Sequence, residues 1–150
     1  MIEYYMNLAL NEAQKAYKKE EVPIGAIIVK DNKVIAKAHN LKEKNNQACA
    51  HAEILAIQKA CKKLNAWRLE ECDMYVTLEP CPMCAGAIIN ARIKNLYIGA
   101  MDPKGGAVGS KLNLLSDYQF NHKVNVEKGI LAEECSNIMK DFFKELRKKK

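Results

Sequence analysis

Two short segments of the chain combine residue types that bind metal ions and move protons. One is His51-Ala52-Glu53, and the other is Cys81-Pro82-Met83-Cys84. Two cysteines three positions apart at the start of a helix project from the same side of its first turn. The unpaired amides at that end of a helix favour thiolates over thiols, and a proline suits the first helical position because no N–H is needed there. The pair therefore predicts half of a metal site, or equally the reactive pair of a thiol redox protein.

The histidine segment favours the metal site. His51 supplies a third ligand, and Glu53 supplies a nearby carboxylate that need not bind the metal. Three protein ligands leave a fourth zinc position for water, which distinguishes a catalytic site from a structural one. Zinc lowers the pKa of such a water toward neutrality, and a neighbouring glutamate can move its proton to a ring nitrogen and a leaving amine. These residues predict hydrolytic removal of an amino group from an aromatic ring. Residues two apart do not share a helix face, so we expect His51 at the helix entrance.

Other interpretations of the cysteines stay open at this stage. Cys81 and Cys84 could be inert core thiols, since free cysteine is often buried. Cys49 could complete a closed structural zinc site, although Glu53 would then have no role. A metal-free redox pair has no use for His51 and Glu53, and iron could replace zinc in the same ligands. The cysteines outside the motif are expected to be small apolar core residues; they are Cys49, Cys61, Cys72 and Cys135.

Sequence patterns predict the elements that must position these segments. Apolar periodicity predicts helices over 2–19, 52–62, 83–92 and 132–147, with Glu12 as an exception on the first apolar stripe. Strands are expected over 25–29, 33–36, 74–78, 94–99 and 124–126, the first two forming a hairpin, and the glycine-rich stretch 101–110 is expected to be a loop. The order predicts a mixed α/β sheet, parallel in part, with helices on its faces. The nearly apolar stretch 85–91 predicts a helix buried on all sides, against the sheet and against a partner subunit.

Composition limits the class of protein. The chain has 150 residues, which is enough for one compact domain, and we expect a single domain over 1–150. Hydrophobic residues make up 49% and charged residues 28%, which is globular composition. The N-terminal segment lacks the order of a signal peptide, and no apolar run is long enough to span a bilayer. We therefore expect a cytoplasmic protein without a membrane partner, whose six cysteines are thiols or ligands before disulfides.

The net charge favours a polyanionic partner. The formal charge is +6, and lysine carries nearly all of it, because Arg68, Arg92 and Arg147 are the only arginines. Lysine acts toward phosphate as a point charge, whereas arginine can read base edges with two hydrogen bonds. The composition therefore supports attraction to a nucleic-acid backbone more readily than sequence readout.

The order His-Ala-Glu, then Pro-Cys-x-x-Cys, resembles the zinc nucleobase deaminases of the cytidine deaminase superfamily. The resemblance implies a three-layer α/β/α cytidine-deaminase-like fold, with a mixed central sheet and helices on both faces. It further implies one Zn²⁺ per subunit, with His51, Cys81 and Cys84 as ligands and Glu53 as the catalytic proton shuttle. No organic cofactor is expected.

Three further segments resemble bacterial tRNA-specific adenosine deaminases. They are Glu21 to Ala26 (EVPIGA), Leu78 to Ala87 (LEPCPMCAGA) and Gly99 to Ser110 (GAMDPKGGAVGS). The resemblance implies that adenosine is converted to inosine at the wobble position of tRNA, that the anticodon stem-loop is the partner, and that the protein is a homodimer. An anticodon loop suits a buried metal site, because its bases are already unstacked.

The same resemblance implies contacts with the RNA. Asn40 matches a position that hydrogen-bonds the adenine, and Asp102 and Lys104 match contacts near the target nucleotide. Asn121 and His122 match positions near the flanking nucleotides, where a ring could stack on an unpaired base.

The C-terminal helix is also implied to meet the RNA, through the basic tail 147–150. Simpler interpretations of several of these residues remain open. Asn40 could only cap a turn, Asp102-Pro103 could be turn chemistry alone, and the tail could be a solvated end.

Three other functions are weighed against tRNA deamination. A deaminase of free nucleobases or nucleotides, acting on guanine or cytosine, would use the same zinc site without RNA. A zinc-stabilised RNA-binding module would have no need of Glu53. A thiol redox protein would contain no zinc.

Overall fold

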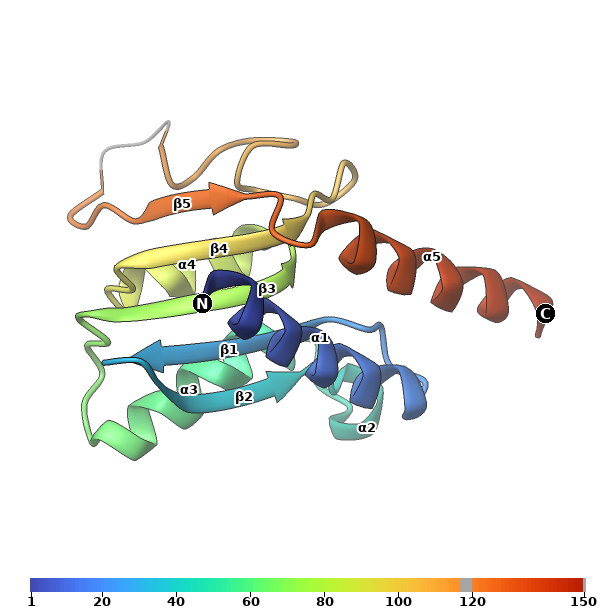
Figure 1. The fold of residues 1–150 in the computed structure, drawn as a ribbon, viewed down its shortest axis with the longest axis horizontal. Coiled ribbons are helices and arrows are strands. Elements are labelled where there is room, and N and C mark those ends of the chain that lie inside the picture. Colours follow the sequence, from blue (N-terminus) through green and yellow to red (C-terminus); the bar gives the residue numbers. More distant parts are fainter. Residues whose placement is uncertain (117–119, 150) are drawn as a thin grey trace.

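The computed structural model describes residues 1–116 and 120–149, and within them five strands form one mixed sheet (Figure 1). The strands are β1 (Gly25–Lys30), β2 (Lys33–His39), β3 (Cys72–Leu78), β4 (Asn95–Ala100) and β5 (Asn125–Lys128). They lie in the order β2-β1-β3-β4-β5. β1 is antiparallel to β2 and β3, whereas β4 is parallel to both β3 and β5. The predicted hairpin and the predicted parallel part of the sheet are both confirmed.

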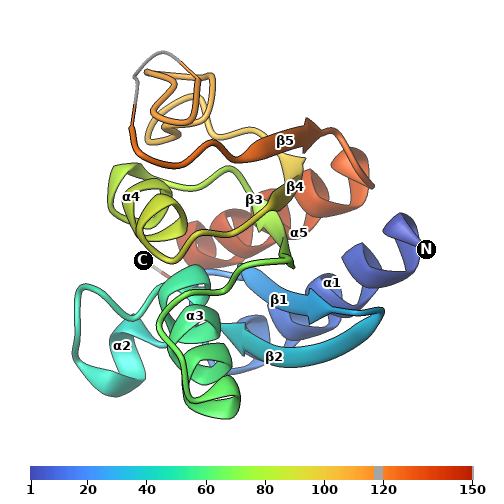
Figure 2. The same cartoon turned by 90° about the vertical axis from the view of Figure 1, so that its left-hand side faces the viewer.

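Helices cover both faces of this sheet, which confirms the three-layer α/β/α arrangement (Figures 1 and 2). α1 (Ile2–Lys18) and α5 (Ala132–Lys148) lie on one face, and α3 (Ala52–Leu64) and α4 (Pro82–Asn90) lie on the other. The short helix α2 (Lys42–Asn45) precedes α3. None of the helices in the described residues is both long enough and apolar enough to cross a membrane.

The strands alternate their side chains between two hydrophobic clusters. On β1, Ile28 packs into the cluster that includes side chains of α3 and α4, and Ile27 packs into the one that includes α1 side chains. Both isoleucines are fully buried. A strand buried on both faces explains the unbroken apolar run from Gly25 to Val29.

The predicted elements agree with the observed ones to within three residues at each end. α2 was not predicted, because four residues are too few to show a helical period. Glu12, the exception on the α1 stripe, is buried because His39 Nδ1 lies 2.9 Å from one carboxylate oxygen and Lys15 Nζ lies 2.7 Å from the other. These partners compensate for the burial of a charge.

One expectation about burial is wrong, and a second is met only in part within a single chain. Within this chain α4 is covered on one side: Met83 is 36% exposed, and a Cβ on Gly86 would meet open space. The sheet and α3 cover only one side of this helix. Cys49 is exposed instead of filling the core, because it lies in the connection between α2 and α3.

Candidate metal centre and substrate pocket

The two chemical segments meet where α3 and α4 begin. His51 is the residue before α3 and has an extended backbone (φ −80°, ψ 150°), as expected for a histidine at the helix entrance. Cys81 holds the same position before α4 (φ −76°, ψ 174°), and Pro82 follows as the first helical residue. Both side chains can therefore point away from their helices toward a shared space.

The ligand atoms are spaced for a metal ion. His51 Nδ1 lies 3.6 Å from Cys81 Sγ and 3.5 Å from Cys84 Sγ, and all three atoms lie within 4.8 Å of one another. Tetrahedral zinc with its usual bonds to sulfur and nitrogen places those ligands about 3.6 Å apart. Among the described residues, these three form the only group of potential ligands within metal-binding distance, and Cys49 is not part of it.

The two sulfurs share one negative charge when no metal lies between them. A hydrogen bond from Cys84 lowers the pKa of Cys81 to about 4, with a further contribution from His51. The pKa of Cys84 is raised, first by its hydrogen bond to Cys81 and then by burial. Two neighbouring thiolates repel each other unless a positive charge lies between them. A metal ion at this position would replace the proton that Cys84 retains in its absence.

Glu53 lies in the first turn of α3, behind the ligands. Its side chain is 3% exposed, and Oε1 has no hydrogen-bond partner among the described residues. Burial raises the pKa of this carboxyl to about 7, although the nearby His51 acts in the opposite direction. A carboxyl that titrates near neutrality can both accept and return a proton under physiological conditions.

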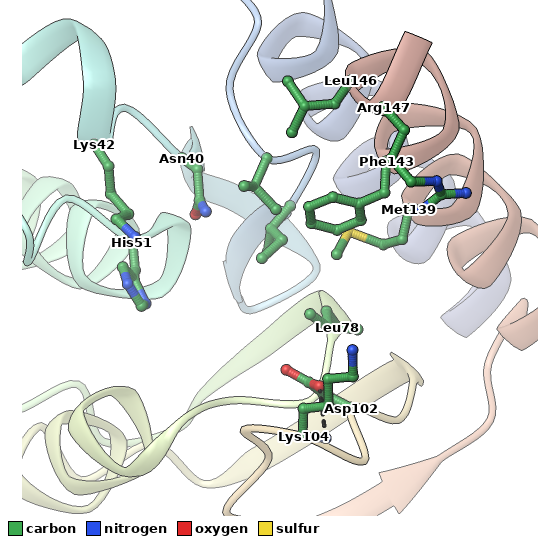
Figure 3. A pocket seen from close by; sticks show the side chains of 12 residues that line it. Asn40, Lys42, His51, Leu78, Asp102, Lys104, Met139, Phe143, Leu146 and Arg147 are labelled. Carbon is green, nitrogen blue, oxygen red and sulfur yellow. Dashed lines mark hydrogen bonds between the residues drawn. The ribbon is translucent and has the colours of Figure 1, made fainter. Parts of the chain in front are cut away.

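A cavity of about 690 Å³ opens beside His51 and is large enough for a nucleoside-sized ligand (Figure 3). Asn40, Lys42 and His51 lie on one side, Asp102 and Lys104 below, and α5 side chains on the far side. The structure thus brings three predicted contact residues to the cavity that contains the histidine ligand. Its other lining residues are Val22, Ile24, Leu78, Met139, Phe143, Leu146 and Arg147.

Asn40 caps a turn and also lies at the cavity. Its Oδ1 accepts a hydrogen bond of 2.7 Å from the Ala52 amide, so the side chain caps the first turn of α3. The residue is buried and also lines the cavity. Because the oxygen is occupied by a backbone donor, the group left to act on a ligand is the Nδ2 donor.

The loop after β4 is organised by a carboxylate that sequence reasoning missed. Glu79 is buried, and its oxygens accept amide hydrogen bonds from Asp102 (2.9 Å), Val108 (2.9 Å) and Ser110 (3.0 Å). A Cβ on Gly106 would overlap this carboxylate, so glycine is required there. The hydrogen bonds lower the pKa of Glu79 despite its burial. Glu79 lies inside the motif from Leu78 to Ala87, and nothing local in the sequence reveals partners more than twenty positions away.

Asp102 also forms the predicted turn with the residues that follow it. Its Oδ1 accepts hydrogen bonds from the amides of Lys104 (3.1 Å) and Gly105 (3.3 Å). The turn chemistry and the position beside the cavity are therefore compatible.

Asn121 and His122 do not lie at the cavity of their own chain. His122 Nε2 is 2.6 Å from the carbonyl oxygen of Ile93, just before β4 begins, whereas Asp102 follows the end of β4. The strand separates them from the cavity. Their contact with RNA stays a prediction.

The basic tail is partly built into the fold. Arg147 lines the cavity, and Lys149 Nζ lies 2.6 Å from a Glu20 carboxylate oxygen. Lys150 lies outside the described residues. The apolar contribution of α5 was missed, although Met139, Phe143 and Leu146 recur at helical spacing beside the buried Phe142.

Comparisons with known proteins agree with this geometry. Residues 2–147 match the MafB19-like deaminase family. The chain is 53% identical over 148 residues to a tRNA-specific adenosine deaminase of Bacillus subtilis (strain 168), covering 99% of this chain and 92% of the relative. It is also similar to a solved structure from a study of A-to-I editing by tRNA:A34 deaminases at the wobble position. The TM-score is 0.87 and the identity 48%, and the match covers 90% of this chain and 98% of the solved one. The structure of a guanine deaminase from Bacillus subtilis is less similar, with a TM-score of 0.65 and 31% identity. This match covers 97% of this chain and 93% of the solved one.

Proposed function

We propose, because the chain belongs to the family of tRNA-specific adenosine deaminases, that it hydrolyses adenosine to inosine at the wobble position of transfer RNA. The observation that carries this assignment is the 53% identity over nearly the whole chain to a relative of that name. The His51, Cys81 and Cys84 group beside the cavity supports the same chemistry. In the net reaction water adds its oxygen to C6 of adenine, and the exocyclic amine leaves as ammonia.

We assign one zinc ion per subunit to His51, Cys81 and Cys84, because a nitrogen and two sulfurs at these separations suit zinc. Zinc supplies the Lewis acidity that makes water nucleophilic at neutral pH. Glu53 is the proton shuttle: its carboxylate accepts the proton of the attacking water, delivers it to the ring nitrogen N1, and later transfers a second proton to the departing amine. Its unpartnered Oε1 and its raised pKa of about 7 support this role.

Asn40 orients the base in this scheme. Its Oδ1 is held by the Ala52 amide, so Nδ2 would donate to adenine N7, which is an acceptor. Asp102, Lys104 and Arg147 line the same cavity and are proposed to contact the RNA around the target nucleotide. Asn121 and His122 are retained as predicted contacts with flanking nucleotides.

The remaining proposals concern the whole protein. We place the partner at the tRNA anticodon stem-loop and the protein in the cytoplasm, as a single domain over residues 1–150 without an organic cofactor. We also propose a homodimer, supported by the uncovered face of α4 around Met83 and Gly86.

A deaminase of free bases is the second candidate, and the similarity to a guanine deaminase favours considering it. The experiment that separates the two measures inosine in an unmodified tRNA with adenosine at the wobble position, beside free adenosine, cytosine and guanine. Inosine in the tRNA without reaction of the free compounds is expected. Activity on a free base alone would overturn the assignment to RNA and leave the metal chemistry intact.

A further inference from the structure

Lys42 is a cation at the cavity to which the described part of the chain supplies no ion-pair partner. It is exposed on α2 and lines the main cavity as well as a smaller one of about 230 Å³ between α2 and α5. Within residues 1–116 and 120–149 no carboxylate forms an ion pair with it, and the same holds for Lys104, the other lysine at the main cavity. An exposed lysine without a partner, facing a ligand cavity, is available to bind an anion.

Its position complements the cations already assigned to RNA. Lys42 lies on the wall that carries His51, whereas Lys104 and Arg147 lie on other sides of the cavity (Figure 3). Asp102 is the only acidic residue among those that line it. A polynucleotide whose base enters the cavity has a backbone phosphate on each side of that nucleotide. Lysine suits such a phosphate, because it acts as a point charge without demanding a fixed geometry.

The short helix that carries Lys42 is held by a buried carboxylate. Glu21 is 2% exposed, and its oxygens accept hydrogen bonds from the amides of Glu43 (3.1 Å) and Lys44 (2.7 Å). α2 has only four residues and no side-chain cap of its own. A helix of this length is not stable by itself, so the buried carboxylate determines where Lys42 stands.

We propose that Lys42 binds a backbone phosphate of the substrate RNA next to the target nucleotide, and that Glu21 is the positioning residue that holds Lys42 in place. The proposal rests on the proposed function for the identity of the strand. Loss of either residue should weaken RNA binding.

The test is a titration of the zinc-loaded protein against a fluorescent anticodon stem-loop RNA with adenosine at the wobble position, over about 50 to 200 mM salt. Lys42→Ala should weaken binding several-fold and reduce the slope of log affinity against log salt by about 1. Lys42→Arg should restore most of the slope. Lys44→Ala is the matched control, because it removes the same charge from the same helix at a position that lines neither cavity. Equal effects of Lys42→Ala and Lys44→Ala would overturn the phosphate site.

A double-mutant cycle tests the role of Glu21. Glu21→Gln replaces an acceptor oxygen by a donor facing a backbone amide, so it should weaken RNA binding in the wild-type background and have little further effect with Lys42→Ala. Equal losses in both backgrounds would mean that Glu21 serves only the fold. Glu21→Asp, which retains the charge but shortens the side chain, is measured in the same cycle and decides the question if the glutamine variant does not fold.

Inosine formation is measured on the same RNA. This measurement distinguishes a failure of the phosphate-site proposal from a failure of the proposed deamination. Normal inosine formation with no specific effect of Lys42 would overturn the phosphate site alone. A specific effect of Lys42 on binding without inosine would overturn the deamination of adenosine alone. Absence of RNA binding by the wild-type protein would overturn both.

Discussion

At the scale of single residues, the site depends on the unusual surroundings of one carboxyl group. Glu53 is fully buried beside three potential ligands, with an oxygen that no described residue satisfies. An unpaired buried polar atom costs stability. Such an arrangement is consistent with a group kept for chemistry at the expense of the fold. Two predictions belong to this scale. One tests the proposed catalytic role of Glu53, and the other tests how much its burial reduces the stability of the fold.

Glu53→Ala should retain the metal and the fold while turnover of the tRNA substrate falls by roughly 10²- to 10⁴-fold, the usual contribution of a positioned acid–base group. The measurements are zinc content, thermal unfolding and the single-turnover rate of inosine formation. Glu70→Ala is the control, because this glutamate is exposed and pairs only with Arg68 at 3.7 Å. A Glu53 variant with a normal rate would remove the proposed proton shuttle.

In the metal-free protein, the burial of Glu53 should make the free energy of unfolding depend on pH. Burial raises the pKa of its carboxyl from 4.5 to about 7, so the folded state holds this proton more tightly than the unfolded state does. Its contribution to stability is then greatest below about pH 4.5 and is lost as the pH rises toward 7. After chelation, Glu53→Gln should gain stability relative to wild type across this interval, measured as the difference in free energy of unfolding. If the difference in free energy of unfolding between the two proteins stayed constant over this pH range, the raised pKa of Glu53 would be contradicted.

At the scale of elements, buried acidic side chains hold the segments that surround the cavity. Glu79 holds the loop after β4, and Glu21 holds α2. Both segments lack extended regular structure, so their backbone amides would otherwise have to find water. The placement of Lys42 and Lys104 therefore depends on carboxylates that never reach the ligand.

Glu79→Gln should lower the free energy of unfolding by about 2 kcal/mol, since an amide cannot accept from all the donors around a carboxylate. It should also raise the KM for tRNA more than it lowers kcat, because the loop that carries Asp102 and Lys104 loses its support. Urea unfolding and steady-state kinetics are the measurements. The exposed Glu127→Gln change on β5 is the control. Unchanged stability would show that the amide hydrogen bonds to Glu79 contribute little.

At the scale of the whole molecule, the cavity lies between parts of the chain that are distant in sequence. Asn40, Lys42 and His51 supply one wall, the loop after β4 supplies a second, and α5 supplies another (Figure 3). The net charge of +6 then adds a general attraction to RNA that salt should weaken.

Lys104→Ala should raise the KM for tRNA several-fold, while kcat at saturating substrate changes less, because an RNA contact that takes no part in proton transfer contributes mainly to binding. Lys63→Ala at the end of α3, away from the cavity, is the control for net charge. If both variants bind the anticodon stem-loop as wild type does, the loop after β4 does not contact the RNA.

The sequence by itself determined the candidate metal ligands and the elements that carry them. His51, Cys81 and Cys84 were identified because a helix entrance and a Cys-x-x-Cys turn are local structures, decided by neighbouring residues and by Pro82. The strands and long helices followed from apolar periodicity for the same reason.

Only the tertiary structure decided which distant side chains share the cavity. Phe143 and Lys42 line it, whereas His122 lies at the other end of β4. Glu79 and Glu21 act on amides far along the chain, and α4 leaves a face uncovered. These relations depend on strand order and on how helices pack across the sheet. Such long-range arrangements leave no periodic signal in the residues themselves.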